Sequence, residues 1–267
     1  MTPEQYAALQ TAIAVRVLTY IQRFARLFAG PILGRREWIN LLTLIFPVVQ
    51  QARDESSDLA RQFYDSQREI YLPGEPPHDV LKQEYRFEWF VQDMEPARKK
   101  MSRPNSTDSA IAELAMFAVK QVENGGRRTI IEAVETDPGQ VQGWARVATG
   151  RETCAFCLML VSRGPVYLSA DTAGLDIGDK TALEMIIGGE DISDLMRKWH
   201  PNCDCKVVPV FDRANWPGKD AADRALEAWK QYTLGYSGQD ALNAFRRAVD
   251  GGQISDFRPY AGLSLAA

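Results

Sequence analysis

The residues best suited to bind a metal ion lie in two short segments of the chain. The first is a C-x-x-C motif, formed by Cys154 and Cys157, and the second is an H-x-x-C-x-C motif, formed by His200, Cys203 and Cys205. Together they hold all four cysteines and one of the two histidines of the sequence. A tetrahedral structural zinc ion takes Cys and His ligands from two chelating segments of this kind. The spacing therefore predicts a structural zinc site, with five candidate ligands for four positions.

Three other interpretations of the cysteines stay open: disulfides, a redox C-x-x-C and unliganded core thiols. The N-terminus does not show a basic segment followed by an apolar segment and a cleavage site, so we expect a reducing compartment in which thiols remain available to a metal. A redox C-x-x-C would begin a helix after a strand and would not require a second cluster downstream. The pattern as a whole favours zinc.

The sequence does not decide which four of the five candidates bind. Cys154 and Cys157 are the two best-supported ligands. If the second motif is extended, Cys203 and Cys205 point to the same side, and His200 is either a ligand or a hydrogen-bond donor to a thiolate. A catalytic zinc would need an open coordination position and a nearby acid or base, so we expect a filled, structural site.

Composition limits the classes of function. The chain has 267 residues, of which 45% are hydrophobic, enough for one large domain or two modest ones. A formal net charge of −4 disfavours the coating of nucleic acid, and short basic runs such as Arg127-Arg128 are typical of solvated helix ends. The longest apolar run, residues 41–49, is too short to cross a membrane.

The first half of the chain has the pattern of helices. Thr2, Pro3 and Gln5 form a capping box with proline at the first helical position, and apolar residues then recur at three- and four-residue steps as far as Gly30-Pro31. A second helix is expected from about residue 35 to 70, with a kink or break at Pro47.

Further helices are expected in residues 80–100 and from about residue 107 to a stop at 124–126. Beyond them, β-branched and alternating residues at 129–131, 140–147 and 206–211 predict short strands.

Additional helices are expected at residues 180–187, 192–199, 219–232 and 239–249. The predicted fold class is therefore α+β: a mostly helical N-terminal region (1–126), a small zinc-stapled α+β domain (127–217) and a helical C-terminal tail (218–267).

Two local patterns are interpreted as structural. Trp144 and Arg146 would lie on one face of a strand, where the guanidinium can stack on the indole. The segment Ser162-Arg163-Gly164 invites interpretation as a nucleophile, but its residue types favour the end of a helix, with the glycine at positive φ.

An ordered set of segments resembles a known family. The segments are Trp144-Ala-Arg146, Glu152-Thr153-Cys154-Ala155-Phe156-Cys157, Ser162-Arg163-Gly164-Pro165-Val166-Tyr167, His200-Pro-Asn-Cys203-Asp-Cys205 and Val207-Val208-Pro209-Val210-Phe211. Their combination resembles the Mu F-like head morphogenesis proteins of tailed bacteriophages, particularly the minor capsid proteins of phages that infect actinobacteria. The similarity covers mainly residues 140–212.

The resemblance implies a minor capsid protein with a role in assembly. Such a protein is present in few copies inside the phage head, near the portal vertex, and in the host cytoplasm during assembly. Its implied partners are the portal protein and capsid or scaffold proteins, with packaged DNA as a further candidate and no membrane.

Two alternative functions are a capsid maturation protease and a DNA-binding protein of the head interior. Some relatives are labelled proteases, but the sequence has no H-E-x-x-H motif, and a serine protease would have to recruit His78 or His200. We therefore expect a protein that is not an enzyme.

Overall fold

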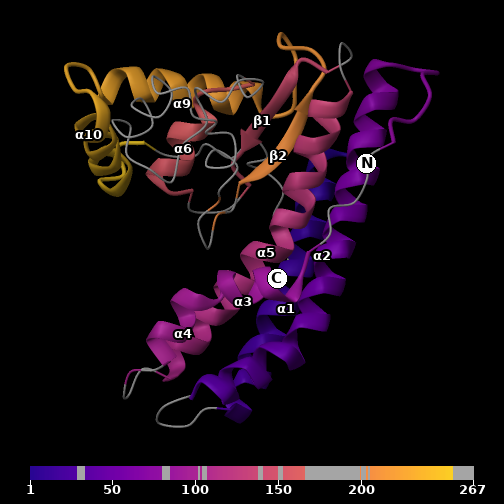
Figure 1. Ribbon diagram of the computed structural model, residues 1–267. Helices are drawn as coiled ribbons and strands as arrows, with labels where there is room; N and C mark the ends of the chain where they lie inside the picture. Colours follow the sequence, from indigo (N-terminus) through magenta and orange to yellow (C-terminus); the bar gives the residue numbers. More distant parts are fainter. Residues whose placement is uncertain are drawn as a thin grey trace, which may run out of the picture.

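Three long helices form the body of the protein in the computed structural model (Figure 1). They are α1 (Pro3–Ala25), α2 (Arg35–Tyr71) and α5 (Thr107–Thr136), and each packs against the other two. The structure describes residues 1–28, 34–79, 85–101, 103, 107–137, 141–149, 153–165, 199, 203 and 205–254.

Three short helices complete this body. A 3-10 turn, η1 (Arg26–Phe28), extends α1, while α3 (Phe87–Asp93) packs on α2 and α4 (Glu95–Met101) packs on α5. Two buried apolar clusters lie in the described part of the molecule, and one of them is formed mainly by residues of these helices, together with Tyr85, which precedes α3.

A small sheet and the three remaining helices of the described residues lie beside one end of the long helices (Figure 1). Strands β1 (Gly143–Val147) and β2 (Lys206–Val210) pair antiparallel, with Trp144 opposite Pro209. Both strands contact α5.

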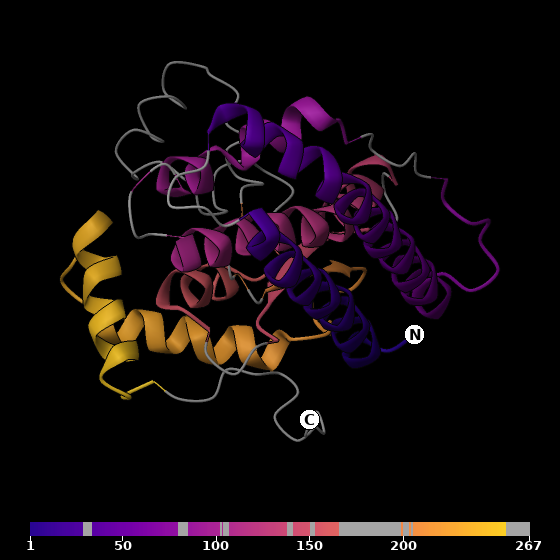
Figure 2. The same cartoon turned by 90° about the horizontal axis from the view of Figure 1, so that it is seen from below.

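Helix α6 (Ala155–Val161) contacts β1, and also α9 (Lys219–Tyr232) and α10 (Gly238–Asp250). Figure 2 shows that α10 turns sharply away from α9. The predicted fold class is confirmed: a mostly helical N-terminal region is followed by a small sheet with buried cysteines and by C-terminal helices.

The start of α1 follows the predicted capping box. The hydroxyl of Thr2 accepts a hydrogen bond from the backbone N–H of Gln5 at 3.2 Å, and the backbone N–H of Thr2 donates to the Gln5 side chain at 2.9 Å. Pro3 occupies the first helical position, where its missing N–H has no cost. The expected stop at Gly30-Pro31 lies outside the described residues.

Helix α2 is not broken at Pro47. It continues over 37 residues, although proline removes one backbone hydrogen bond. Apolar side chains on both sides of the proline, Leu42, Ile45 and Val49, are fully buried against the neighbouring helices. Their burial offsets the local loss and keeps the helix continuous.

The predicted helix stop at residues 124–126 and the predicted strand at 129–131 are wrong, because α5 continues to Thr136. Gly125 and Gly126 allow α5 to approach α2 closely. The backbone N–H of Gly126 donates to Ser56 Oγ at 3.1 Å, and a Cβ at Gly126 would lie 2.8 Å from the same oxygen. Tertiary packing thus outweighs the weak helical propensity of glycine.

The other predictions for the second half have mixed outcomes. The strands expected at 140–147 and 206–211 are confirmed as β1 and β2, and the last two expected helices are α9 and α10. Residues 180–187 and nearly all of 192–199 lie outside the described part of the chain. The division at residue 126 falls within α5, and the three-part domain division stays a prediction.

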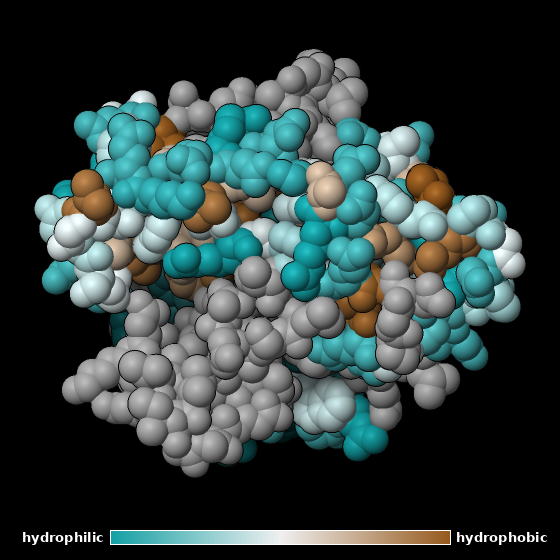
Figure 3. Space-filling model, turned by 90° about the horizontal axis from the view of Figure 1, so that it is seen from above, coloured by the Kyte–Doolittle hydropathy of each residue, from teal (hydrophilic) through white to brown (hydrophobic). Residues whose placement is uncertain are grey.

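Polar side chains cover much of the described surface on the face shown in Figure 3, with smaller apolar areas between them. None of the described helices combines the length and the hydropathy needed to cross a membrane.

Candidate metal centre

Three buried cysteines meet at one point of the structure. The sulfur atoms of Cys157, Cys203 and Cys205 all lie within 4.8 Å of one another, and those of Cys157 and Cys203 are 3.5 Å apart. Tetrahedral zinc with Zn–S bonds of about 2.3 Å separates its sulfur ligands by about 3.8 Å. A disulfide would instead require about 2.05 Å, and no two of the four cysteines are joined in this way. The spacing fits ligands arranged around one ion.

Two elements position these sulfurs. Cys157 lies in the first turn of α6, whose N-cap is Cys154, and the Cys154 sulfur accepts a hydrogen bond from the backbone N–H of Cys157 at 3.4 Å. Cys203 and Cys205 directly precede β2, which β1 holds in an antiparallel pair. The sulfurs of Cys203 and Cys205 lie within 4.8 Å of each other, which agrees with the expectation that both point to the same side.

The structure thus brings together three of the five predicted ligands. Cys154 is exposed and does not belong to the group of three mutually close sulfurs, although its side chain hydrogen-bonds that of Cys157. His200 lies outside the described residues. The roles of Cys154 and His200 as ligands therefore stay predictions.

Arg127 is a buried residue of the site that the sequence analysis missed. Its guanidinium donates to the carbonyl oxygens of Cys203, at 2.8 Å, and Cys205, at 3.1 Å. It also pairs with Glu123, which in turn pairs with Lys206 at 2.6 Å. Burial lowers the pKa of Arg127, but Glu123 and the two cysteines raise it, and the net direction is upward. Only the second residue of the basic pair, Arg128, is exposed.

A second buried guanidinium belongs to Arg146 on β1. Its central carbon lies 3.5 Å from the ring centroid of Trp199, and that of Arg127 lies 4.4 Å from the same ring. The predicted stacking of Arg146 on Trp144 is therefore wrong, because Trp199 takes that place. Nε and Nη2 of Arg146 have no hydrogen-bond partner among the residues that the structure describes.

The surroundings favour a thiolate at Cys203. Hydrogen bonds from Cys157 and Cys205 lower the pKa of Cys203, against the opposing effect of burial, and the charges of Arg127 and Arg146 lower it further. Hydrogen bonds with Cys154, Cys203 and Cys205, together with burial, raise the pKa of Cys157. The thiolate is the form that binds metals, so the lowered pKa of Cys203 favours its role as a ligand.

The chemistry of the donors agrees with this geometry. Cys157, Cys203 and Cys205 form a buried group that is able to bind a metal ion. Clustered thiolates select soft or borderline ions such as Zn²⁺ and Cu⁺ over Mg²⁺ and Ca²⁺.

Comparison with known protein families gives a match over most of the chain. The family described as VG15 protein matches residues 2–232. The chain belongs to the VG15 family. Two relatives of the chain come from mycobacteriophages. The gene 15 protein of Mycobacterium phage L5 is 46% identical to it over 96% of this chain and 97% of its own length.

The gene 15 protein of Mycobacterium phage D29 is 50% identical to the VG15 chain, over 79% of this chain and 80% of its own length. No solved structure matches. The chain is thus a phage protein homologous to the mycobacteriophage gene 15 proteins.

The segment around Ser162 in the VG15 chain has the predicted structural role. Ser162 is the C-cap of α6, and its hydroxyl donates to the carbonyl oxygen of Met159 at 2.6 Å. Gly164 follows with a φ of 64°, a conformation that favours glycine. The hydroxyl is buried at a helix end, as expected for a residue that terminates a helix.

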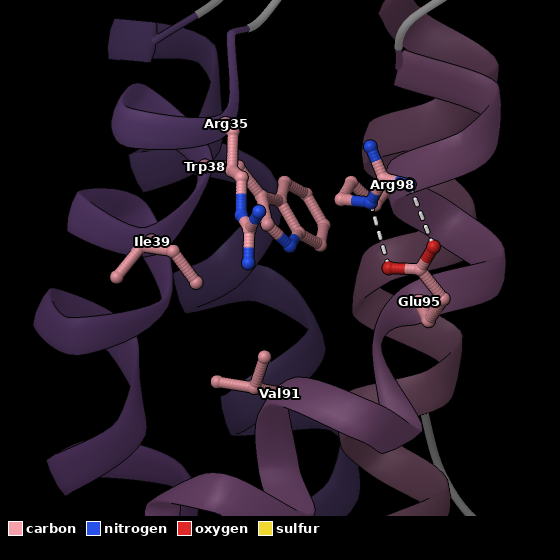
Figure 4. A pocket seen from close by; sticks show the side chains of 6 residues that line it. All are labelled: Arg35, Trp38, Ile39, Val91, Glu95 and Arg98. Atoms are coloured by element: carbon pink, nitrogen blue, oxygen red, sulfur yellow. Dashed lines mark hydrogen bonds and ion pairs between the residues drawn. The ribbon is translucent and has the colours of Figure 1, made fainter.

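The protein also has a pocket of about 340 Å³ between α2, α3 and α4 (Figure 4). Arg98 closes one side of it through two hydrogen bonds to Glu95, at 2.6 and 2.7 Å. The indole N–H of Trp38 is buried there and has no hydrogen-bond partner within the described residues. Trp38 therefore contributes apolar packing but leaves one polar group unsatisfied.

Proposed function

We propose that this protein is a minor capsid, head morphogenesis protein of a tailed bacteriophage. It lies inside the head near the portal vertex and binds the portal protein and capsid or scaffold proteins. A structural zinc ion stabilises the part of the fold that contains the cysteines. The proposal extends to the Mu F-like type of head protein, which the motifs of residues 140–212 resemble.

One observation carries the proposal: the segments that resemble Mu F-like proteins form one compact unit. The described residues of those segments lie in β1, in and directly beside α6, and in and directly beside β2. Cys157 of the first motif meets Cys203 and Cys205 of the second, just before the start of β2. The homology to phage gene 15 proteins agrees with a phage function. A shared site of this kind supports a common fold, and from it a common role in the head.

The metal has a clear physical task in this unit. A sheet of two five-residue strands is marginal by itself in water. Structural zinc supplies folding free energy on the order of 10 kcal/mol in small peptides. Bound through Cys157, Cys203 and Cys205, the ion would join α6 to β2 and hold both against α5. The long helices then remain available for contacts with partner proteins.

The metal content of the purified protein tests the proposed structural zinc site. We expect one zinc ion per chain in the purified protein, and a Cys157→Ser variant that loses the ion and unfolds at a much lower temperature. Ser162→Ala, which changes a hydroxyl near the other end of the same helix, serves as the control and should keep the ion. A Cys157→Ser protein of unchanged metal content and stability would refute the structural zinc.

A phage that encodes this chain tests the role in the head. With a stop codon in the gene, we expect few filled heads, and complementation should restore them. Mass spectrometry of purified wild-type heads should detect the protein, and co-expression should recover it bound to the portal protein. Normal heads without the protein, or its absence from both heads and assembly intermediates, would overturn the proposal.

Two further assays separate the alternative functions. A protease would cleave the major capsid or scaffold protein during long incubation, whereas we expect both to stay intact. A DNA-binding protein would bind duplex DNA with an affinity that falls steeply with salt, whereas we expect no binding even at low ionic strength.

A further inference from the structure

We infer that Cys154 is the fourth ligand, and that the centre is a four-thiolate site whose double negative charge is balanced by the buried guanidiniums of Arg127 and Arg146. This inference rests on the metal site in the proposed function and is independent of the role in the phage head.

The C-x-x-C segment holds Cys154 beside Cys157. Cys154 caps α6, and its sulfur accepts the backbone N–H of Cys157 at 3.4 Å. This hydrogen bond holds the Cys154 sulfur beside the first turn of α6, where its side chain also hydrogen-bonds that of Cys157. The Cys154 sulfur is thus the next thiol beside the three converging sulfurs in the described part of the chain. Its exposure leaves a path by which the ion can enter.

Buried charges surround the sulfurs of the candidate centre. Arg127, Arg146 and Lys206 are buried cations, and Glu123 is the carboxylate that pairs with two of them. These four described groups together carry two positive charges in excess. Zn²⁺ with four thiolates carries two negative charges, whereas Zn²⁺ with three thiolates and a neutral imidazole carries one. The four-thiolate set therefore balances the charge of these four groups, and a buried charge without such balance is costly.

Arg146 supplies the strongest part of this argument. It is 1% exposed, and its Nε and Nη2 atoms have no hydrogen-bond partner in the described part of the chain. Its guanidinium stacks on the face of Trp199. Its positive charge lowers the pKa of Cys203. A buried guanidinium in this position is explained by an anionic metal centre beside it. Arg146 makes no described hydrogen bond to a ligand sulfur through Nε or Nη2. It therefore acts on the centre through its charge, as a positioning residue and not as a ligand.

X-ray absorption on the zinc-loaded wild-type protein tests the ligand set directly. Four sulfur neighbours at about 2.3 Å are expected, and three sulfurs with one nitrogen at about 2.0–2.1 Å would overturn the inference. This measurement needs no variant and so does not depend on whether a substituted chain folds. A wild-type protein that binds no zinc would instead defeat the structural zinc itself.

A matched pair of variants identifies the fourth ligand. In the cobalt-substituted protein, Cys154→Ser should lose about a quarter of the thiolate-to-metal charge-transfer absorption per ion, because one of four Co–S bonds is lost. His200→Gln should leave the spectrum and the zinc affinity unchanged. Unchanged charge-transfer absorption in Cys154→Ser would overturn the inference, and a loss of zinc affinity in His200→Gln alongside it would make His200 the ligand.

A second pair of variants tests the balance of charge. Arg146→Met should weaken zinc binding by about ten-fold or more in competition with a chelator, and Arg146→Lys should recover part of the loss. The stability of the metal-free protein should not fall in Arg146→Met, since the guanidinium is uncompensated without the ion. A loss of stability in the metal-free state with unchanged zinc affinity would show that Arg146 has only a packing role.

Discussion

The guanidinium of Arg127 on α5 lies 2.8 Å from the carbonyl oxygen of Cys203, in the segment that precedes β2. The same nitrogen, Nη2, donates hydrogen bonds to this oxygen and to the carbonyl oxygen of Cys205. These carbonyl groups belong to two of the three converging cysteines, so one side chain of the long helices fixes the backbone of the candidate metal centre. The centre is therefore attached to the helical body through α5.

Substitution of Arg127 by methionine should destabilise the whole protein. The change leaves Glu123 without one partner and two buried carbonyl oxygens without their donor, and removing one member of a buried ion pair typically costs about 3–5 kcal/mol. Urea unfolding followed by circular dichroism measures this loss. The exposed neighbour provides the control, because Arg128→Met should change the free energy of unfolding by about 0.5 kcal/mol or less. Equal effects of the two substitutions would contradict the role given to Arg127.

Asp137, just beyond the end of α5, should make stability depend on pH. It accepts hydrogen bonds from the Tyr64 hydroxyl at 2.8 Å and from Arg68 Nε at 2.9 Å. Burial raises the pKa of Asp137, but the two donors lower it more, and the net direction is downward. A carboxyl group whose pKa is lower in the folded state stabilises the fold above its unfolded pKa of about 3.9, and that contribution is lost as the pH falls through the folded value.

Asp137→Asn should therefore lower the free energy of unfolding by about 3 kcal/mol near neutral pH, as for a broken buried pair. The difference from the wild type should shrink at pH values below about 4, where the unfolded carboxyl becomes protonated. Urea titrations at a series of pH values measure it. Glu69→Gln, at an exposed position of α2, is the control and should have little effect. A difference that grows as the pH falls would have the wrong sign.

Local sequence signals predicted the parts of the fold that depend on local chemistry. The capping box at Thr2 and Gln5 is present as expected, and the helix expected at residues 219–232 has the bounds of α9. The convergence of Cys157 with Cys203 and Cys205 could also be expected, because soft ligands at chelating spacings are typical of residues that share one metal ion.

Features that depend on tertiary contacts were not predictable in the same way. Gly125 and Gly126 have the residue type of a helix stop, and only the approach of α2 makes them a site of close packing. Arg127 has the residue type of a solvated cation, and its burial depends on carbonyl groups far along the chain. One signal was present in the sequence: Val122, Ile130 and Val134 continue the apolar pattern of α5 across the glycine pair at four-residue steps.

Gly126→Ala tests the close approach of the helices. A Cβ at this position would lie 2.6 Å from the side-chain nitrogen of Gln10 and 3.0 Å from the carbonyl oxygen of Ser56. Alanine has a helical propensity about 1 kcal/mol more favourable than that of glycine. Overpacking, however, costs about 1–3 kcal/mol. The added methyl group would also displace the buried hydrogen bonds between Gln10 and Ser56. We expect a net loss of stability in thermal unfolding. The loss should be smaller in a Gln10→Ala background, and a double-mutant cycle without coupling would argue against this contact.

Trp38→Phe should be tolerated despite the complete burial of the side chain. The indole N–H has no hydrogen-bond partner among the described residues, and an unsatisfied buried donor costs about 1–3 kcal/mol. Phenylalanine removes that donor but leaves a small cavity, so the two effects oppose each other. We expect a free energy of unfolding within about 1 kcal/mol of the wild type, whereas Trp38→Ala should lose about 3–5 kcal/mol. Urea unfolding of the three proteins decides the matter. A Trp38→Phe variant as unstable as Trp38→Ala would show that the N–H is paired in solution.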